Sequence, residues 1–468
     1  MKMKNKKRRV ELLSFYDHVG ISRHLEKMAA KGWMLEKITN LGWVYHRIEP
    51  KQLHFTVSYY SKASEFDPEP TEDQKTFYDF CAHTGWQLAC ASAQLQIFYN
   101  ERENPTPIET DAKLEVEAIH ASAKKSFIPA YLALFVIALL NGGLFVSGIM
   151  GDPIKVLSSP SRLFSGFAFL VLAIICLVEL ICYFGWFHKA KAAAEYGEFL
   201  KTPHTATFQK ITMAVILLGA LYWIISYIIL GSPLERWVAV LMCIYMPALF
   251  AIVNAVKQFL KQKKAARGVN RTVTMLSSFV LAFAMMALIT FGTLYASNHG
   301  AFREKNEETY KHGGITWVIH HDNIPLTVED LLGADNYEYI KERTGSMSFM
   351  LGQFTMSQYP RFDEENYADI PQLEYTLTEV RIPALYNLCK NRLIYEQEEL
   401  YPLDKHEYKA EDGKAWGANE AYRLYDLEYG VENKYLLCYD NLLVEIDFDW
   451  EPTAAQKAVV GEKLGSLK

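Results

Sequence analysis

Cysteine is scarce in this chain. Among 468 residues there are only seven, and no two of them form a C-x-x-C pair. A small secreted scaffold held together by disulfides needs a much denser cysteine framework, so that class of protein is excluded. Five of the seven are expected to be small buried apolar groups: Cys81, Cys90, Cys176, Cys182 and Cys243.

Catalytic motifs are also missing. The chain has no G-x-x-x-x-G-K-[ST], no G-x-S-x-G, no H-E-x-x-H and no EF-hand loop. Asp447 and Asp449 share one face of an expected strand, but adjacent acids in an acidic domain are usually solvated. The sequence therefore indicates no catalytic residue and no cofactor. A protein that is not an enzyme is expected, although an enzyme without a known motif stays open.

Charge is sparse in the middle of the chain and abundant at both ends. Residues 1–126 hold 18 Lys and Arg against 17 Asp and Glu, residues 127–300 hold 13 against 5, and residues 301–468 hold 17 against 32. These stretches carry +1, +8 and −15, which agrees with the net charge of −6. A wholly soluble enzyme or a disordered chain does not segregate charge in this way. The pattern predicts a membrane protein with a soluble domain at each end.

The middle region, 127–296, contains five apolar windows that are long enough to cross a bilayer, which takes about 20 residues of helix. Four of them lack Asp, Glu, Lys and Arg, and one contains only Glu179. The fold class predicted is a polytopic α-helical membrane protein. Its expected spans are 127–150, 163–187, 211–230, 237–256 and 272–296.

Basic residues indicate the orientation, because Lys and Arg beside a span resist translocation. The connection 188–210 has four Lys and 257–271 has six Lys and Arg, whereas 151–162 has two and 231–236 has one. The N-terminal domain is therefore expected in the cytoplasm. Because the number of spans is odd, the acidic C-terminal domain is expected on the opposite, extracytoplasmic side.

Three residues with a carboxylate or amide side chain lie inside the expected spans: Glu179, Asn141 and Asn254. A carboxylate at this depth is unfavourable unless it is paired, protonated or in contact with water. Glu179 is thus a candidate for proton coupling or substrate binding. The alternative is a Glu that is hydrogen-bonded to a neighbouring helix and serves packing.

The N-terminal part is expected to be a basic tail over 1–9 and an α+β domain over 10–115. Its apolar periodicity alternates between those of strands and helices. A short internal echo, LEKMAAKGWML at 25–35 and YDFCAHTGWQL at 78–88, suggests two half-units and a ferredoxin-like fold. The expected strands are 10–16, 42–49, 52–61 and 86–100, and the expected helices are 21–32 and 74–85.

The two central strands are expected to form a hairpin around Pro50 and Lys51. In that register one face of the sheet lies under the helices and the other stays open. An open face can bind a base, a peptide or another subunit, or pack against the membrane loops. We expect it to bind a cytoplasmic protein or a second copy of the chain, and no nucleic acid. Its candidate residues are Trp43, Tyr45, Arg47, His54 and Tyr60.

The run FYDHVGISRHLEKMAAKGWML at 15–35, together with the second Gly-Trp block at Gly85, resembles domain-of-unknown-function family 2812. The resemblance covers roughly residues 10–115. Members are membrane proteins of Gram-positive bacteria, which implies the bacterial cytoplasmic membrane as the location. They have no assigned reaction. Many are encoded beside PadR-like transcription regulators, which implies a stress-response or signalling setting.

The C-terminal region, 301–468, is expected to begin with a charged stalk and to continue as an acidic α+β domain on the extracytoplasmic side. Its expected strands are 316–321, 346–358, 375–380, 435–438 and 442–449, and its expected helices are 327–332, 382–399 and 453–464.

Two groups in this domain could bind a metal or form a disulfide. His312, His320, His321 and Asp322 form a tight cluster, but a strand would direct adjacent His side chains to opposite faces, so no metal site is assigned. Cys389 and Cys438 are the only cysteines of the domain, and an external location permits a disulfide between them. Whether they are bridged stays open.

The pattern as a whole favours a membrane sensor or regulatory protein, in which an outer domain receives a signal and an inner domain binds a partner. A transporter, or an accessory subunit of one, that uses Glu179 is the main alternative. Five spans are few for a self-contained carrier, which favours the sensor.

Overall fold

The computed structural model describes residues 5–39, 42–302, 308–333, 337–364, 367–400, 406–426 and 430–467. The chain divides into two compact units. The first comprises residues 1–142, 168–221 and 237–295, and the second comprises 143–167, 222–236 and 296–468. Each unit thus contains one terminal domain and parts of the apolar helices. Residues 303–307, where the predicted stalk begins, lie outside the described residues.

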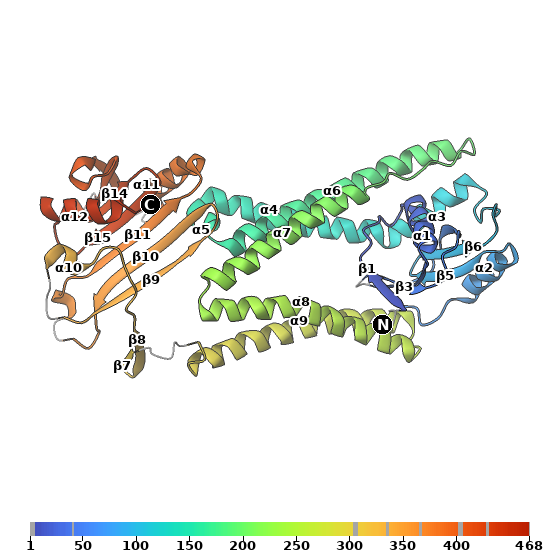
Figure 1. Ribbon diagram of the computed structural model, residues 1–468, viewed down its shortest axis with the longest axis horizontal. Coiled ribbons are helices and arrows are strands. Elements are labelled where there is room, and N and C mark those ends of the chain that lie inside the picture. Colours follow the sequence, from blue (N-terminus) through green and yellow to red (C-terminus); the bar gives the residue numbers. More distant parts are fainter. Residues whose placement is uncertain are drawn as a thin grey trace. The chain divides into compact units, whose positions relative to one another are not determined.

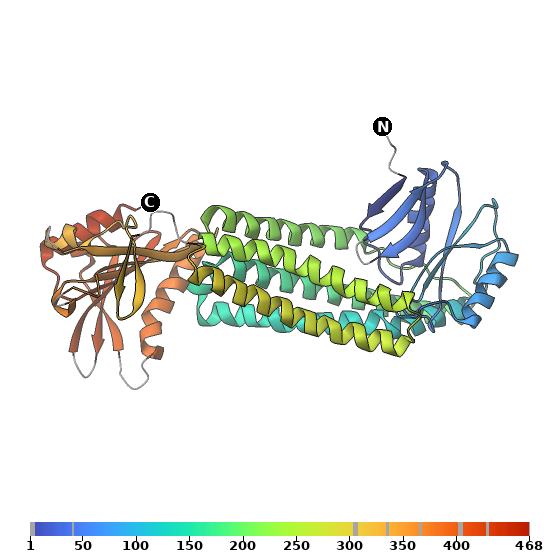
Figure 2. The same ribbon diagram turned by 90° about the horizontal axis from the view of Figure 1, so that it is seen from below.

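Among the described residues, five helices are long and apolar enough to cross a membrane. Many of their Leu, Ile, Val and Phe side chains are exposed, as expected for surfaces that face lipid. Five long apolar helices are thus present where the spans are predicted, and each helix extends beyond the predicted range (Figure 1; Figure 2). They are α4 (Phe127–Gly151), α6 (Pro160–Ala194), α7 (Ala206–Leu230), α8 (Pro233–Gln262) and α9 (Arg267–Asn298), with the short helix α5 (Pro153–Leu157) between α4 and α6.

The N-terminal domain consists of two repeats of the same topology. In each repeat the chain order is strand, helix, strand, strand. The three strands form an antiparallel sheet in which the last strand of the repeat lies between the other two. The helix α3 (Ala112–Lys125) follows the second repeat. The first repeat is β1 (Lys6–Arg9), α1 (His18–Ala30), β2 (Trp33–Thr39) and β3 (Gly42–Arg47), and the second is β4 (His54–Tyr59), α2 (Glu72–His83), β5 (Gln87–Ser92) and β6 (Leu95–Asn100).

The two repeats correspond in detail. Gly32 and Gly85 follow the two helices, are 53 positions apart, and have φ angles of +77° and +92°. The strands β3 and β6 also begin 53 positions apart. Each Gly-Trp-x-Leu motif is followed by a bulge at the same place, after Leu35 in β2 and after Leu88 in β5. The short echo in the sequence therefore marks a full structural repeat.

The predicted strand pairing is wrong. Pro50 and Lys51 do not close a hairpin, because β3 pairs with β1 and β2 whereas β4 pairs with β6. The prediction omits β2 and treats 86–100 as one strand, although this range holds two strands and a turn at Ala93 with φ +50°. The first predicted strand, 10–16, is irregular, and part of the predicted tail forms β1. With two three-stranded sheets, the ferredoxin-like fold is not confirmed.

The C-terminal domain is built on a seven-stranded antiparallel sheet with the order β12-β13-β14-β15-β11-β10-β9. A two-stranded sheet, β7 and β8, precedes it. Each predicted element corresponds to an observed one, but the prediction omits four strands, β7, β9, β12 and β13. The strands are β7 (Glu308–His312), β8 (Ile315–Ile319), β9 (Tyr339–Met347), β10 (Leu351–Pro360), β11 (Leu373–Val380), β12 (His406–Glu411), β13 (Glu420–Asp426), β14 (Gly430–Cys438) and β15 (Leu442–Phe448), and the helices are α10 (Val328–Leu332), α11 (Tyr386–Leu400) and α12 (Ala454–Gly465).

An apolar cluster lies on each face of the large sheet. Neighbouring residues of β14 alternate between them, since Tyr435 and Leu437 belong to one cluster and Leu436 and Cys438 to the other. Helices α10 and α12 contribute to the first cluster together with the fully buried Trp416. Helices α11 and α5 contribute to the second. The predicted α+β organisation of this domain agrees with this arrangement.

The positive φ angles at the Gly-Trp motifs lead to a stability prediction. In Gly32→Ala, a Cβ would lie 2.8 Å from the carbonyl oxygen of Ile48, and in Gly85→Ala it would meet the side chain of Arg102 at 3.0 Å. Each variant should lose about 1–2 kcal/mol of unfolding free energy. Gly268→Ala, where a Cβ meets nothing within 4 Å, is the matched control. Thermal unfolding of the full chain in detergent measures this, and equal losses in all three variants would contradict it.

Candidate functional site at the junction of the N-terminal domain with the membrane helices

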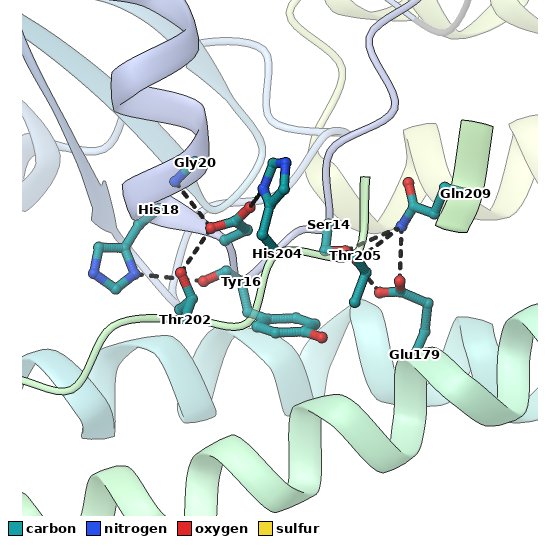
Figure 3. A network of polar contacts seen from close by, with 10 residues as sticks. Ser14, Tyr16, His18, Gly20, Glu179, Thr202, His204, Thr205 and Gln209 are labelled. Carbon is teal, nitrogen blue, oxygen red and sulfur yellow. Dashed lines mark hydrogen bonds and ion pairs between the residues drawn. The ribbon is translucent and has the colours of Figure 1, made fainter. Parts of the chain in front are cut away.

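The first unit contains a polar junction between the N-terminal domain and α6 and α7 (Figure 3). Its centre is the junction segment, residues 14–17, with the sequence Ser-Phe-Tyr-Asp. This segment lies between β1 and α1 and has no regular secondary structure. Each of its four side chains contacts α4, α6 or the residues around the start of α7. The segment therefore attaches the N-terminal domain to the membrane helices.

Glu179 of α6 is fully buried and accepts hydrogen bonds on both carboxylate oxygens. The Ser14 hydroxyl donates to Oε2 at 2.7 Å, and the Gln209 amide of α7 donates to Oε1 at 2.8 Å. The Ser14 oxygen also lies 2.6 Å from the hydroxyl of Thr205. One carboxylate therefore joins three separate segments of the chain (Figure 3).

Asp17 forms the second polar contact of the junction. It caps α1 by accepting a hydrogen bond from the Gly20 backbone N–H at 2.9 Å. The same carboxylate accepts from the Thr202 hydroxyl at 2.7 Å and lies 3.2 Å from Nδ1 of His204. A Cβ on Gly20 would lie only 2.1 Å from the Asp17 carboxylate, so this approach requires glycine. The residues that precede α7 thus contact the N-terminus of α1 directly.

Aromatic packing surrounds these polar contacts. Tyr16 is fully buried, with ring centroids 5.2 Å from Tyr183 and 6.0 Å from Trp186, both on α6. Burial, followed by the charge of Glu179, raises the pKa of the Tyr16 hydroxyl well above its ordinary value. Tyr16 therefore stays neutral and acts as an apolar anchor.

Phe15 connects the junction to the second repeat. Its ring stacks on Phe127 of α4 at 6.2 Å and meets the edge of Tyr59 of β4 at 5.3 Å. The Tyr59 hydroxyl donates to the Phe15 carbonyl oxygen at 2.7 Å. Both repeats are therefore held at the same junction.

Ionic contacts join the loop before α2 to the adjoining ends of α8 and α9. Arg267 donates to both carboxylate oxygens of Asp67, from Nε at 2.5 Å and from Nη2 at 2.8 Å. Lys257, with a side chain only 10% exposed, contacts Glu65 at 3.0 Å. The amide of Asn270 donates to the Phe66 carbonyl oxygen at 3.2 Å. Basic residues that the sequence uses to indicate orientation thus also bind the N-terminal domain.

The structure does not bring the predicted open-face residues onto one surface. Tyr45 is fully buried, Trp43 is 9% exposed, and both belong to the core of the domain. Arg47 is exposed and lies over the Trp33 ring, whereas His54 and Tyr60 belong to the second repeat. The open face depends on the hairpin register, which is wrong. Partner binding by this domain stays a prediction.

The other predicted residues lie apart from the junction. Asn141 is exposed and donates to the Ile137 carbonyl oxygen of its own helix at 2.8 Å, and Asn254 is half-buried in α8. Cys389 and Cys438 are both free thiols that belong to one apolar cluster. Burial raises the pKa of the Cys389 thiol to about 11 and that of Cys438 to about 12, which disfavours the reactive thiolates.

The predicted histidine cluster is a surface group. His321 is exposed and lies 3.4 Å from Glu308, while Asp322 accepts a hydrogen bond from the Arg343 backbone N–H. Of the junction residues, the sequence indicates only Glu179 as functional. Ser14 and Gln209 are missed because they become neighbours of Glu179 only through packing.

Residues 20–131 match the family model described as "Protein of unknown function (DUF2812)". This stretch carries the domain of that family. The match confirms the resemblance predicted from the sequence, and it spans α1 to the beginning of α4, including both Gly-Trp motifs. No curated protein and no solved structure matches the chain.

The contact of Arg267 with Asp67 can be tested by a double-mutant cycle. Replacing each residue and both by Ala should reveal a coupling of about 0.5–1 kcal/mol, weaker at high salt, because the pair is bidentate but only partly buried. The control pair Lys264 and Glu69, with side chains 72% and 54% exposed, should show less coupling. Thermal unfolding in detergent gives both values. Equal coupling in the two pairs would contradict the assignment.

Proposed function

We propose that this chain is a sensor or regulatory protein of the bacterial cytoplasmic membrane, in which the state of the C-terminal domain reaches the N-terminal domain through α6 and α7. The observation that carries the proposal is the fully buried carboxylate of Glu179. It is bound at once by the junction segment through Ser14 and by α7 through Gln209. A displacement of α6 against α7 must therefore alter the attachment of the N-terminal domain.

Contacts inside the second unit support the same route. There Ser161, near the start of α6, accepts a hydrogen bond from Trp223 of α7 at 3.1 Å. Tyr222 of α7 accepts one from the Phe349 backbone N–H of the C-terminal domain at 3.0 Å, and Ser348 donates to the Leu157 carbonyl oxygen of α5. Hence α7 contacts the C-terminal domain in one unit and the N-terminal junction in the other.

The proposed orientation has the N-terminal domain in the cytoplasm and the C-terminal domain outside. The ionic contacts of Arg267 and Lys257, and the contact of Asp17 with His204, support a common side for the N-terminal domain and the two basic connections. Basic connections are typical of the cytoplasmic side. An odd number of spans then gives the C-terminal domain the opposite side. We expect the N-terminal domain to bind a cytoplasmic protein or a second copy of the chain.

The alternative is a transporter, or an accessory subunit of one, that couples through Glu179. Its support is the complete burial of this carboxylate in an apolar helix. The hydrogen bonds of Glu179 favour the sensor, because its partners Ser14 and Gln209 belong to segments that attach a domain.

Two substitutions of Glu179 distinguish the candidates. Glu179→Gln keeps the shape and a hydrogen-bonding group, so the sensor proposal expects folded yield, stability and native phenotype close to wild type. Glu179→Leu leaves the Ser14 and Gln209 donors buried without this acceptor. The variant should therefore lose about 1–3 kcal/mol of unfolding free energy. The exposed Glu198→Gln is the control. A folded Gln variant that loses the native phenotype, or that loses a cation uptake which wild type shows in vesicles, would support the transporter instead.

Reporter fusions test the orientation. A reporter that is active only in the cytoplasm should function when fused after residue 110, which precedes α3. A reporter that is active only after export should function after residue 310, which follows α9. Cytoplasmic activity at both positions would mean an even number of spans and would overturn the arrangement.

A further inference from the structure

Three potential metal ligands meet at one edge of the large sheet in the C-terminal domain. They are His406 of β12, Asp426 of β13 and Glu432 of β14, and one ligand atom of each lies within 4.8 Å of the others. The register explains the meeting, because His406 and Asp426 are direct cross-strand partners and Glu432 is two residues beyond the partner of Asp426.

The distances match those between ligands of a single ion. Nε2 of His406 lies 3.2 Å from Oδ2 of Asp426 and 3.1 Å from Oε1 of Glu432. Ligands held at about 2.1 Å from one divalent metal ion are separated by about 3.0–3.4 Å in octahedral or tetrahedral geometry. The imidazole is thus already at the spacing from each carboxylate that such an ion requires, and the ligand atoms of the two carboxylates lie within 4.8 Å of each other.

Two of the three side chains in this group are largely buried, so their positions are fixed by the surrounding sheet. The side chains of His406 and Asp426 are 12% and 7% exposed, whereas that of Glu432 is 37% exposed. Two ligands are therefore held by the sheet, and the third lies on the solvent side. The partly exposed Glu432 carboxylate gives an ion access to the group from solvent.

The surrounding face of the sheet is acidic. A hollow of about 330 Å³ over β10, β11, β14 and β15 is lined by Glu374, Glu445, Asp447 and Asp449, with Lys434 as a basic residue among them. Asp447 lies near enough to Glu432 for their charges to interact. This field raises the local concentration of cations beside the three ligands.

We propose that His406, Asp426 and Glu432 bind one divalent transition-metal ion of the Zn²⁺ or Mn²⁺ type. A mixed set of one imidazole and two carboxylates suits these ions better than Ca²⁺ or Mg²⁺, which prefer oxygen ligands alone. The site goes beyond the proposed sensor role and does not depend on it, because binding can be measured without any signalling output.

The test measures the metal content of the purified full chain in detergent. The protein is stripped with a chelator, dialysed against buffered Zn²⁺ or, separately, Mn²⁺, and analysed by mass spectrometry of the metal. Wild type should bind one more ion per chain than His406→Gln and Glu432→Gln. Its melting temperature should also rise with the ion, whereas those of the two variants should not. The control His321→Gln removes an exposed imidazole that lies beside one carboxylate, and it should bind as wild type does.

The two variants keep the proposal falsifiable. His406→Gln alters a mostly buried residue, but Glu432→Gln alters a partly exposed one that should leave folding intact, as unfolding in the metal-free state would verify. Equal metal content in wild type, Glu432→Gln and the His321→Gln control would overturn the proposal. In that case the three side chains form a polar cluster that holds no metal ion.

Discussion

The hydrogen bonding of the Glu179 carboxylate is the constraint on which the first unit depends. A fully buried carboxylate in an apolar helix is unfavourable unless polar groups replace the water that it loses. Here the replacements come from outside α6, from Ser14 and Gln209. Packing of the N-terminal domain against the membrane helices therefore supplies a hydrogen bond that this buried carboxylate needs. Asp17 and the Tyr16 ring extend the same contact to the beginning of α1 and to α6.

The basic connection between α8 and α9 serves two physical purposes. Its positive charges disfavour translocation, which makes them an orientation signal. Arg267 and Lys257 also bind Asp67 and Glu65 of the N-terminal domain. Because Lys257 is largely buried, its pairing with Glu65 also offsets the desolvation of the ammonium group. The orientation signal can be predicted from the local composition of the sequence. The contacts with the N-terminal domain can be identified only from the folded structure.

Local signals were sufficient for the helices and insufficient for the pairing of strands. Apolar runs identify the five spans because each helix satisfies its own backbone hydrogen bonds. The repeated Gly-Trp motif correctly marks two similar halves, yet the ladder partners of β3 cannot be read from neighbours in sequence. A short Pro50-Lys51 connection suggests a hairpin, but β3 already has a partner on each side. For the same reason Glu179 could be predicted as a candidate and its partner Ser14, 165 residues away, could not.

The partners of Glu179 also bear on how a signal could pass through the proposed sensor. Ser14, Thr205 and Gln209 are neutral, so the network changes through the geometry of its hydrogen bonds and not through a change in their charge. Hydrogen bonds weaken steeply with distance and angle, so a shift of α6 against α7 would release one donor while it kept the other. A buried donor without an acceptor is unfavourable, which leaves few stable arrangements of the three segments. Under the proposed function, the junction would therefore change between discrete arrangements, and the N-cap at Asp17 would carry the change to α1.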